Sequence, residues 1–256
     1  KFIIMANNMK YFIGNWKMFG VPKSIKIINK INSYIKKHKF NKKYKVIIAP
    51  PFTLLETFSK KFKNTKISIC AQNCYQKDYF SSDTGSISPY MIKKLGTNFV
   101  IIGHSDNRAQ GDTENLIKKK INIALKNNLK VIFCIGENKL QKRKRKTLAV
   151  LKKQIRGSLE KKINKDNIIV AYEPIWSIGT GKVPSPNDLS KTINYIKKEF
   201  KDFFKTKKIP LVLYGGSVDG KMIENFLGLS AIDGFLIGGA SKSSKNFIDI
   251  IKNYYR

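Results

Sequence analysis

A carboxylate at the end of a hydrophobic run is the first residue of this sequence that could do chemistry. Residues 171–182 read AYEPIWSIGTGK, so Glu173 is followed by a proline, a large aromatic residue and a glycine-rich segment. A Walker-type phosphate loop would need Gly in place of Trp176 and Ser or Thr in place of Val183. The third glycine of a dinucleotide-binding fingerprint would fall on Pro184. Neither nucleotide-binding pattern fits, so we expect the function of this segment to involve Glu173.

Other polar residues also stand at the ends of hydrophobic runs. An imidazole, an ammonium and a carboxylate can together move a proton and stabilise a developing negative charge. The polar residues at these ends are Asn15, Lys17, Gln72, Asn73, His104, Glu137 and Glu173, and glycine pairs end two later runs. Taken alone, a lysine is weak evidence of a functional site in so lysine-rich a chain. A histidine at a strand end is equally compatible with a core residue that is hydrogen-bonded to backbone.

Eight short hydrophobic runs must position these residues. Each run is rich in β-branched and aromatic residues and apolar along its length, which is typical of strands buried on both faces of a parallel sheet. The runs span residues 11–16, 45–50, 67–73, 98–105, 129–137, 168–174, 210–216 and 233–239. Segments with helical spacing lie between them, such as IKIINKINSYIKK and LSKTINYIKKEF. Eight such units in 256 residues predict an α/β fold, a single-domain (β/α)8 barrel of parallel strands.

In such a barrel the carboxyl ends of all strands converge on one mouth, where active sites lie. Polar residues far apart in the sequence thereby become one predicted site. No low-complexity linker marks a domain boundary, so we expect residues 1–256 to form one domain. The chain begins with Lys1, and Met5 and Met9 could each initiate translation, so residues 1–9 are expected to be an N-terminal extension or a region of alternative starts.

The composition is strongly basic. Fifty Lys and Arg against 17 Asp and Glu give a formal net charge of +33. A charge of this sign attracts nucleic acid, anionic lipid and anionic small molecules without specificity. The lysines are scattered through helical segments, which favours a solvated outer shell, and the run KRKRK at 142–146 is the densest polyanion-binding candidate.

Cysteine usage and hydropathy indicate a reducing compartment and no membrane span. Cys70, Cys74 and Cys134 are an odd number without metal-ligand spacing, which predicts free thiols and a cytoplasmic protein. No apolar run approaches the ~20 residues of a membrane helix. We expect no membrane partner, no specific nucleic-acid partner and no bound metal.

Seven segments of the chain carry a resemblance to a known family. They are, in order, GNWKM, AQN, IIGHS, CIGE, AYEPIWSIGTGK, YGGSV and DGFLIGGAS. Together they cover nearly the whole chain and resemble the signature segments of the triosephosphate isomerase family. The resemblance implies a TIM barrel that interconverts dihydroxyacetone phosphate and D-glyceraldehyde 3-phosphate, without a cofactor, in glycolysis and gluconeogenesis.

The resemblance implies a role for each catalytic residue. Glu173 matches the base that moves a proton between two substrate carbons through an enediolate. His104 matches a neutral electrophile whose pKa the family lowers with a helix N-terminus. Lys17 matches the lysine near the phosphate and the developing oxyanion, and Asn15 matches the residue that orients the substrate and that lysine.

Other residues match phosphate donors and the parts of a lid. The family pattern places phosphate-binding groups at Gly179, Ser217, Gly238 and Gly239, where bare backbone N–H groups can approach a dianion. The segment after Glu173 resembles a lid that closes over the phosphate and protects the enediolate from losing it. The residues matched to supporting roles are Trp176 in the first hinge, Tyr214 that holds the lid closed, and Glu137, Cys134 and Thr84.

Three departures from the family pattern concern the subunit interface and the lid. Ser86 and Asn107 stand where the family has a glutamate and an arginine that pair across a dimer interface, so we expect a homodimer with an altered, weaker interface. Thr84 still matches a residue that reaches the active site of the partner. Pro184 replaces a small residue in the second lid hinge, where its fixed φ is expected to slow lid motion.

A second hypothesis belongs to a different class of function. The net charge of +33 would also suit a catalytically silent or moonlighting barrel protein that binds polyanions. The presence of Asn15, Lys17, His104 and Glu173 argues against a loss of catalytic activity but is compatible with a second, polyanion-binding role. Another phosphate-binding barrel enzyme would account for the glycine pairs, but not for NWK, GHS and YEPIW together.

Overall fold

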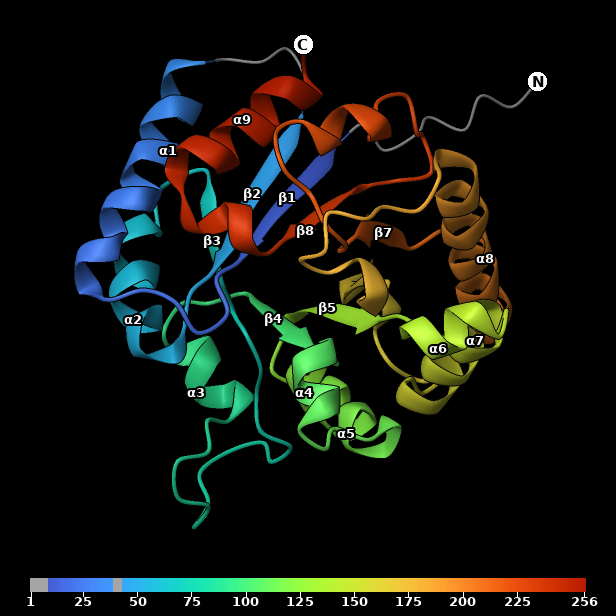
Figure 1. The fold of residues 1–256 in the computed structure, drawn as a ribbon. Helices are drawn as coiled ribbons and strands as arrows, with labels where there is room; N and C mark the ends of the chain where they lie inside the picture. Colours follow the sequence, from blue (N-terminus) through green and yellow to red (C-terminus); the bar gives the residue numbers. More distant parts are fainter. Residues whose placement is uncertain (1–8, 39–42) are drawn as a thin grey trace.

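The structure is a computed structural model that describes residues 9–38 and 43–256. Eight parallel strands close into a barrel in sequence order, and β8 pairs with β1. Figure 1 shows these strands at the centre of the molecule and the helices around them. The predicted (β/α)8 fold is confirmed. The proposed N-terminal extension lies outside the described residues except for Met9.

All eight predicted strands are present, and each ends one to three residues before its hydrophobic run does. This places most of the polar residues in the loops that follow the strands. The strands are β1 (Lys10–Asn15), β2 (Tyr44–Ala49), β3 (Ile67–Ala71), β4 (Phe99–Ile102), β5 (Lys130–Ile135), β6 (Ile168–Tyr172), β7 (Leu211–Tyr214) and β8 (Gly234–Ile237).

The helices surround the barrel and connect successive strands. The α-helices are α1 (Ile25–Lys37), α2 (Phe52–Phe62), α3 (Pro89–Lys94), α4 (Ser105–Ala109), α5 (Glu114–Lys126), α6 (Lys139–Arg143), α7 (Thr147–Ser158), α8 (Pro186–Phe204) and α9 (Ser244–Tyr254). Short 3-10 helices are η1 (Pro22–Ser24), η2 (Lys165–Asn167), η3 (Ile175–Ser177), η4 (Met222–Phe226) and η5 (Gly239–Lys242). The seventh strand is followed by η4 instead of an α-helix, so the strict alternation breaks once.

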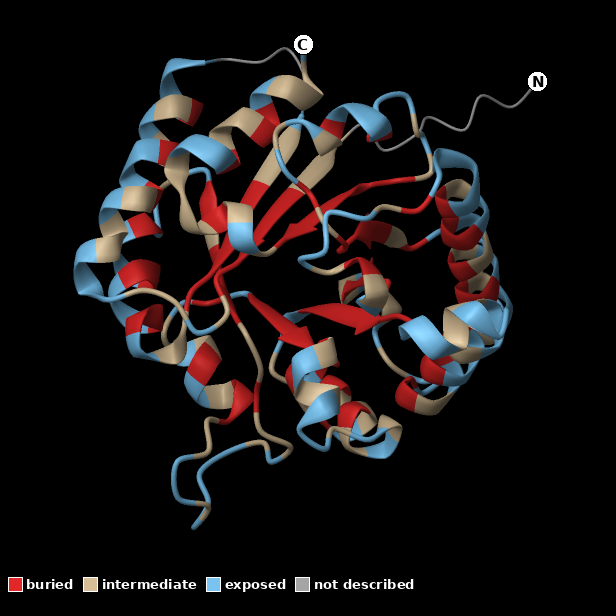
Figure 2. Cartoon of the chain, viewed as in Figure 1, coloured by how far each residue is buried: buried red, intermediate tan, exposed pale blue. Residues whose placement is uncertain are grey.

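Alternation along each strand divides the core into two layers. Successive side chains point to opposite faces of a strand, so in β1 Ile13 lies inside the barrel and Phe12 packs under the helices. Figure 2 shows the strands buried along most of their length, while most of the surrounding helices have a buried inner face and an exposed outer face. Both strand faces are therefore apolar, as the continuous hydrophobic runs predicted.

Helix boundaries follow local capping chemistry. In α8, Pro186 occupies the first turn, where its missing N–H costs nothing, and the Ser185 hydroxyl accepts from the backbone N–H of Asp188 at 3.1 Å. The helix ends at Phe204, and Lys205, directly after it, adopts the left-handed conformation. The lid segment is thus followed directly by a helix with a well-capped N-terminus.

Candidate active site

A cavity of about 480 Å³ opens at the carboxyl ends of the strands. The predicted catalytic and phosphate-binding residues all line it, although they come from the ends of five different strands. They are Asn15, Lys17, His104, Glu173, Gly179, Ser217, Gly238 and Gly239. The geometry therefore brings together the groups that the sequence separated by more than 200 positions.

His104 and Glu173 face each other at the floor of this cavity. His104 Nε2 lies 3.1 Å from Glu173 Oε1, and both side chains are buried. On the other side of the ring, the backbone N–H of Asp106 donates to His104 Nδ1 at 3.0 Å. Because an amide N–H only donates, Nδ1 must be the unprotonated nitrogen, which places the proton on Nε2 toward the carboxylate.

The charge balance around His104 differs from the sequence expectation. A lowered pKa was expected, and burial alone does lower the pKa of His104. The carboxylates of Glu173 and Asp106 raise it by more, so the net direction is upward from 6.5. In the neutral ring, the hydrogen bond from Asp106 sets the tautomer, because a proton on Nδ1 would set two donors face to face. The expectation of a lowered pKa is thus wrong.

Lys17 is held in a strained conformation that aims its side chain into the cavity. Its φ is +54°, a left-handed value that is uncommon for a residue with a long side chain. The backbone N–H of Lys17 donates to Asn15 Oδ1 at 3.1 Å, and Gln72 Nε2 donates to the carbonyl of Lys17 at 2.9 Å. Lys17 Nζ lies 3.0 Å from Asp106 Oδ2. These contacts fix the ammonium beside His104.

The opposite wall of the cavity is mostly bare backbone. Among the residues that the structure describes, no heavy atom lies within 4 Å of the position that a Cβ would take at Gly179, Gly238 or Gly239, apart from their chain neighbours. Their backbone is therefore open to the cavity. Ser217 lies beside them in the loop after β7. An arrangement of open N–H groups and a hydroxyl suits an anionic group such as a phosphate.

Two glycines allow the loops to close around the catalytic carboxylate. A Cβ at Gly136 would lie 1.7 Å from the carbonyl oxygen of Glu173, and one at Gly215 would lie 2.8 Å from its Cγ. Both distances are shorter than real contacts. Glu173 is therefore held from both sides by backbone that tolerates no side chain.

Three of the residues predicted to have supporting roles lie around the hinges of the lid, namely Trp176, Glu137 and Tyr214. Trp176 Nε1 donates to Glu137 Oε1 at 2.8 Å, and the hydroxyl of Tyr172 donates to the same buried carboxylate at 3.2 and 3.1 Å. The Tyr214 hydroxyl lies 3.0 Å from Ser177 Oγ. These contacts connect the first hinge with the loops after β5 and β7.

Cys134 and Thr84 lie outside the cavity wall. Cys134 is buried in the inner core of the barrel, where burial, and then the Glu173 carboxylate, raise the pKa of its thiol well above the ordinary value. A thiol held in this way is an inert packing residue. Thr84 is exposed on the segment between β3 and α3, which projects from the barrel in Figure 1.

Sequence reasoning did not give the contacts of three residues next to the catalytic groups. Asp106 pairs with Lys17, Gln72 holds the backbone of Lys17, and Ser177 joins the lid to Tyr214. Gln72 gave a weak signal as a polar residue at a strand end. Lys242 places its Nζ 5.4 Å from the ring centroid of Phe19, a cation–π contact.

A second cavity, of about 820 Å³, lies near the amino ends of several strands. Lysines and two aspartates line it, and the predicted site residues do not. It is the larger of the two, but the smaller cavity holds the paired acid and base. Among the described residues, no helix is long and apolar enough to cross a membrane, and no three acidic, histidine or cysteine side chains form a metal-binding group.

Comparison with known proteins agrees with this geometry. A protein of Dictyoglomus thermophilum named triosephosphate isomerase is 38% identical over 250 residues, which cover 95% of this chain and 99% of that protein. A protein of the same name from Wolbachia pipientis wMel is 39% identical over 242 residues, with 94% and 92% covered. The crystal structure of triosephosphate isomerase from Bartonella henselae superposes with a TM-score of 0.86 at 30% identity, covering 96% of this chain and 99% of that one. The family model described as triosephosphate isomerase matches residues 10–254, and the chain belongs to the triosephosphate isomerase family.

Proposed function

We infer that the chain interconverts dihydroxyacetone phosphate and D-glyceraldehyde 3-phosphate, the reaction of glycolysis and gluconeogenesis for which its family is named. The observation that carries the inference is the contact of a buried carboxylate with a buried imidazole, 3.1 Å apart, in one cavity with Lys17. These are the groups that a proton transfer next to a carbonyl requires.

Glu173 acts as the base. Its carboxylate takes a proton from C1 of dihydroxyacetone phosphate, and the electron pair of the broken C–H bond moves toward the carbonyl oxygen on C2 to form an enediolate. The hydroxyl proton on O1 moves to O2, and the same carboxyl group returns the carbon-bound proton to C2. A carbonyl is left at C1, which yields glyceraldehyde 3-phosphate. No electron leaves the substrate, so the reaction needs no redox cofactor.

His104 and Lys17 stabilise the negative charge that develops on the substrate oxygens. The proton on His104 Nε2 is aimed into the cavity because the backbone N–H of Asp106 occupies Nδ1. The ammonium of Lys17 lies on the same side, and Asn15 holds its backbone. In a cavity closed to water, preorganised donors of this kind stabilise a developing charge strongly.

The phosphate binds at the glycine-rich wall. The backbone at Gly179, Gly238 and Gly239 and the hydroxyl region of Ser217 would surround it, since these groups line the cavity. Gly179 is exposed and belongs to the lid. Because a lid residue binds the phosphate, phosphate binding stabilises the closed lid, and the closed lid in turn strengthens phosphate binding. Exclusion of water then keeps the enediolate from expelling its phosphate.

We further propose that the active form is a homodimer. The projecting segment between β3 and α3 carries exposed Tyr79 and Phe80, whose rings pack on each other and on Tyr90. Met18, next to the catalytic lysine, has 98% of its surface exposed. Large apolar side chains in such positions suit burial against a second copy. Thr84 on the same segment would then reach the active site of the partner.

The interface is expected to be weaker than that of the family because Ser86 and Asn107 replace an ionic pair. Because both charged residues are replaced, no unpaired charge is left at the interface. Sedimentation across a range of concentrations, with activity measured in parallel, tests this proposal. A fully active monomer at the assay concentration would contradict it.

The setting is proposed to be the cytoplasm, which the three free, buried cysteines support. The second hypothesis, a silent or moonlighting polyanion binder, rests on the net charge of +33 alone, and the comparisons give it no support. A coupled assay of glyceraldehyde 3-phosphate formation, beside DNA binding at low and physiological salt, separates the two. Absent turnover with salt-resistant DNA binding would favour the second.

A further inference from the structure

The side chain of Ser177 occupies a junction between the lid and the loop after β7. Ser177 is fully buried and is the last residue of η3, directly before the exposed glycine-rich part of the lid. Its Oγ lies 2.5 Å from the carbonyl oxygen of Lys182, 3.0 Å from the Tyr214 hydroxyl and 3.3 Å from the backbone N of Ser217. One hydroxyl thus contacts three separate points of the chain.

Donor and acceptor rules assign a direction to each of these three hydrogen bonds. A carbonyl oxygen only accepts, so the single proton of Ser177 goes to the carbonyl of Lys182. The backbone N–H of Ser217 only donates, and the hydroxyl of Tyr214 must then donate as well. Burial raises the pKa of Tyr214 to about 12, although its bond with Ser177 lowers it, so the phenol keeps the proton it donates. The hydroxyl of Ser177 thus donates one hydrogen bond and accepts two, which satisfies its hydrogen-bonding capacity.

These bonds have two different mechanical effects. The bond to the Lys182 carbonyl ties the beginning of the lid to its end, across Gly179 and Gly181, whose φ values of +69° and +72° turn the chain. The bonds from Tyr214 and Ser217 dock that tied segment onto the end of β7 and the loop after it. Two further bonds continue the docking, from the Ser217 hydroxyl to the carbonyl of Ser177 at 2.5 Å and from the Gly181 N–H to the Ser217 hydroxyl at 3.2 Å.

The second hinge cannot replace this contact. Pro184 is buried at the end of the lid and has no backbone N–H to offer to Tyr214. The space around the Ser177 hydroxyl is also closed, since a Cβ at Gly216 would lie 2.6 Å from it and 2.2 Å from the Tyr214 hydroxyl. The loop after β7 is therefore shaped to receive this one hydroxyl.

We propose that Ser177 is a positioning residue that joins both ends of the lid and docks them on Tyr214 and Ser217, so that it keeps water from the enediolate. The proposal rests on the isomerase function argued above and adds a residue to it. Ser177 does not line the cavity, so it acts through the lid and not on the substrate.

The test compares Ser177→Ala, Tyr214→Phe and the double variant with the wild type. Two quantities are measured, kcat/KM in the coupled assay and the inorganic phosphate released per isomerisation, which reports enediolate lost from an open lid. Ser177→Ala is expected to lower kcat/KM about tenfold or more and to raise phosphate release by a similar factor. Tyr214→Phe is expected to have a smaller effect, because it leaves the bond to Lys182 intact.

The matched control is Ser158→Ala. Ser158 is also fully buried, but its hydroxyl has no hydrogen-bond partner within residues 9–38 and 43–256, so its loss is expected to leave both quantities unchanged. In the double variant, the effects of the two single changes are expected to be less than additive, because both remove the same bond.

An active wild type with unchanged phosphate release in Ser177→Ala would overturn the proposal, whatever happens to kcat. So would strict additivity in the double variant. Should Ser177→Ala fail to fold, Tyr214→Phe carries the test, and unchanged phosphate release in that variant equally refutes the docking contact. A wild type without isomerase activity would instead refute the proposed function.

Discussion

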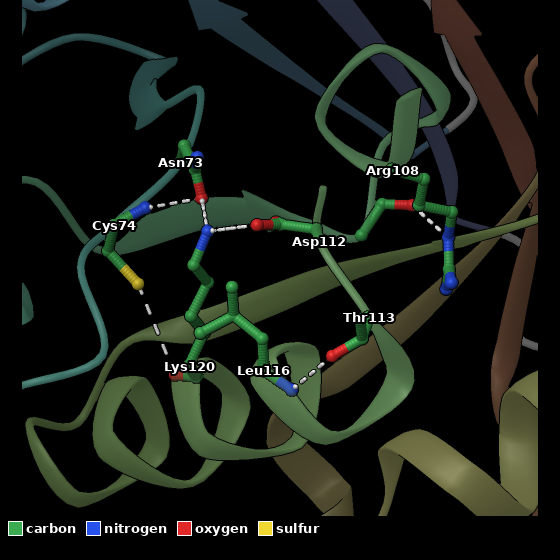
Figure 3. A network of polar contacts seen from close by, with 8 residues as sticks. Asn73, Cys74, Arg108, Asp112, Thr113, Leu116 and Lys120 are labelled. Carbon is green, nitrogen blue, oxygen red and sulfur yellow. Dashed lines mark hydrogen bonds and ion pairs between the residues drawn. The ribbon is translucent and has the colours of Figure 1, made fainter. Parts of the chain in front are cut away.

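Replacing Asp112 by alanine is expected to destabilise the protein severely, because it removes one partner of a buried ion pair. Lys120 Nζ lies 2.8 Å from both carboxylate oxygens of Asp112, and the two side chains are only 7% and 10% exposed. Figure 3 shows the ammonium between Asp112 and Asn73, whose Oδ1 is its remaining acceptor at 3.3 Å. In Asp112→Ala the ammonium stays buried with that one neutral partner.

The magnitude follows from this geometry. Removing one partner of a buried pair costs about 3–5 kcal/mol, since the remaining charge is neither hydrated nor neutralised. For a chain of this size, each kcal/mol lowers the melting temperature by about 2–4 °C. The expected drop is therefore roughly 6–20 °C. Because Asn73 begins the segment that projects toward the proposed partner subunit, that segment is expected to become more sensitive to proteolysis.

Scanning calorimetry at fixed protein concentration measures the effect. Glu56→Ala is the control, because its pair with Lys60 is exposed and contributes little. The double variant Asp112→Leu with Lys120→Met removes both charges and is expected to regain most of the loss. A melting temperature for Asp112→Ala that matches the control would refute the reasoning, as would a double variant no more stable than Asp112→Ala.

Three further predictions concern the catalytic site. Gly215→Ala is expected to lower kcat about 100-fold with the fold retained, because its Cβ would push the side chain of Glu173 aside, and unchanged kcat would contradict this packing. The carboxylates facing His104 raise its pKa above 6.5. Protonation of His104 should therefore stabilise the folded state fully below pH 6.5. This stabilisation is expected to be lost as the pH rises through the raised pKa of the folded state. Accordingly, the acid limb of kcat/KM should lie above pH 6.5 and move to lower pH in Asp106→Asn; a shift to higher pH would refute the sign. Pro184→Ala is expected to raise turnover modestly by freeing the second hinge, and an equal rate would dismiss that role.

Most of the fold could be predicted from the sequence. Continuous apolar runs such as the one that contains β6 identified every strand, because burial on both faces leaves few polar positions inside a strand. The run IKIINKINSYIKK coincides with α1, because its apolar spacing marks one buried face. Strand ends were less certain, since the apolar runs continue into the loops that line the cavity.

The site was predictable where motif and strand end coincided, as at His104 and Glu173. The contacts of Asp106, Gln72 and Ser177 were not, because each depends on a partner far away in the sequence or on a strained backbone, such as that of Lys17. The direction of the His104 pKa also depends on which carboxylates face the ring in three dimensions. Spacing along the chain carries no information about that.

The central claim is that the Glu173 carboxylate moves a carbon-bound proton beside His104 and Lys17. The coupled assay of wild type and Glu173→Asp tests it most directly, because the change keeps the charge and withdraws it by one methylene. The account predicts an active wild type and a variant whose kcat falls about 100-fold or more while KM changes little. A variant with the turnover of the wild type, or one whose loss appears only in KM, would contradict it.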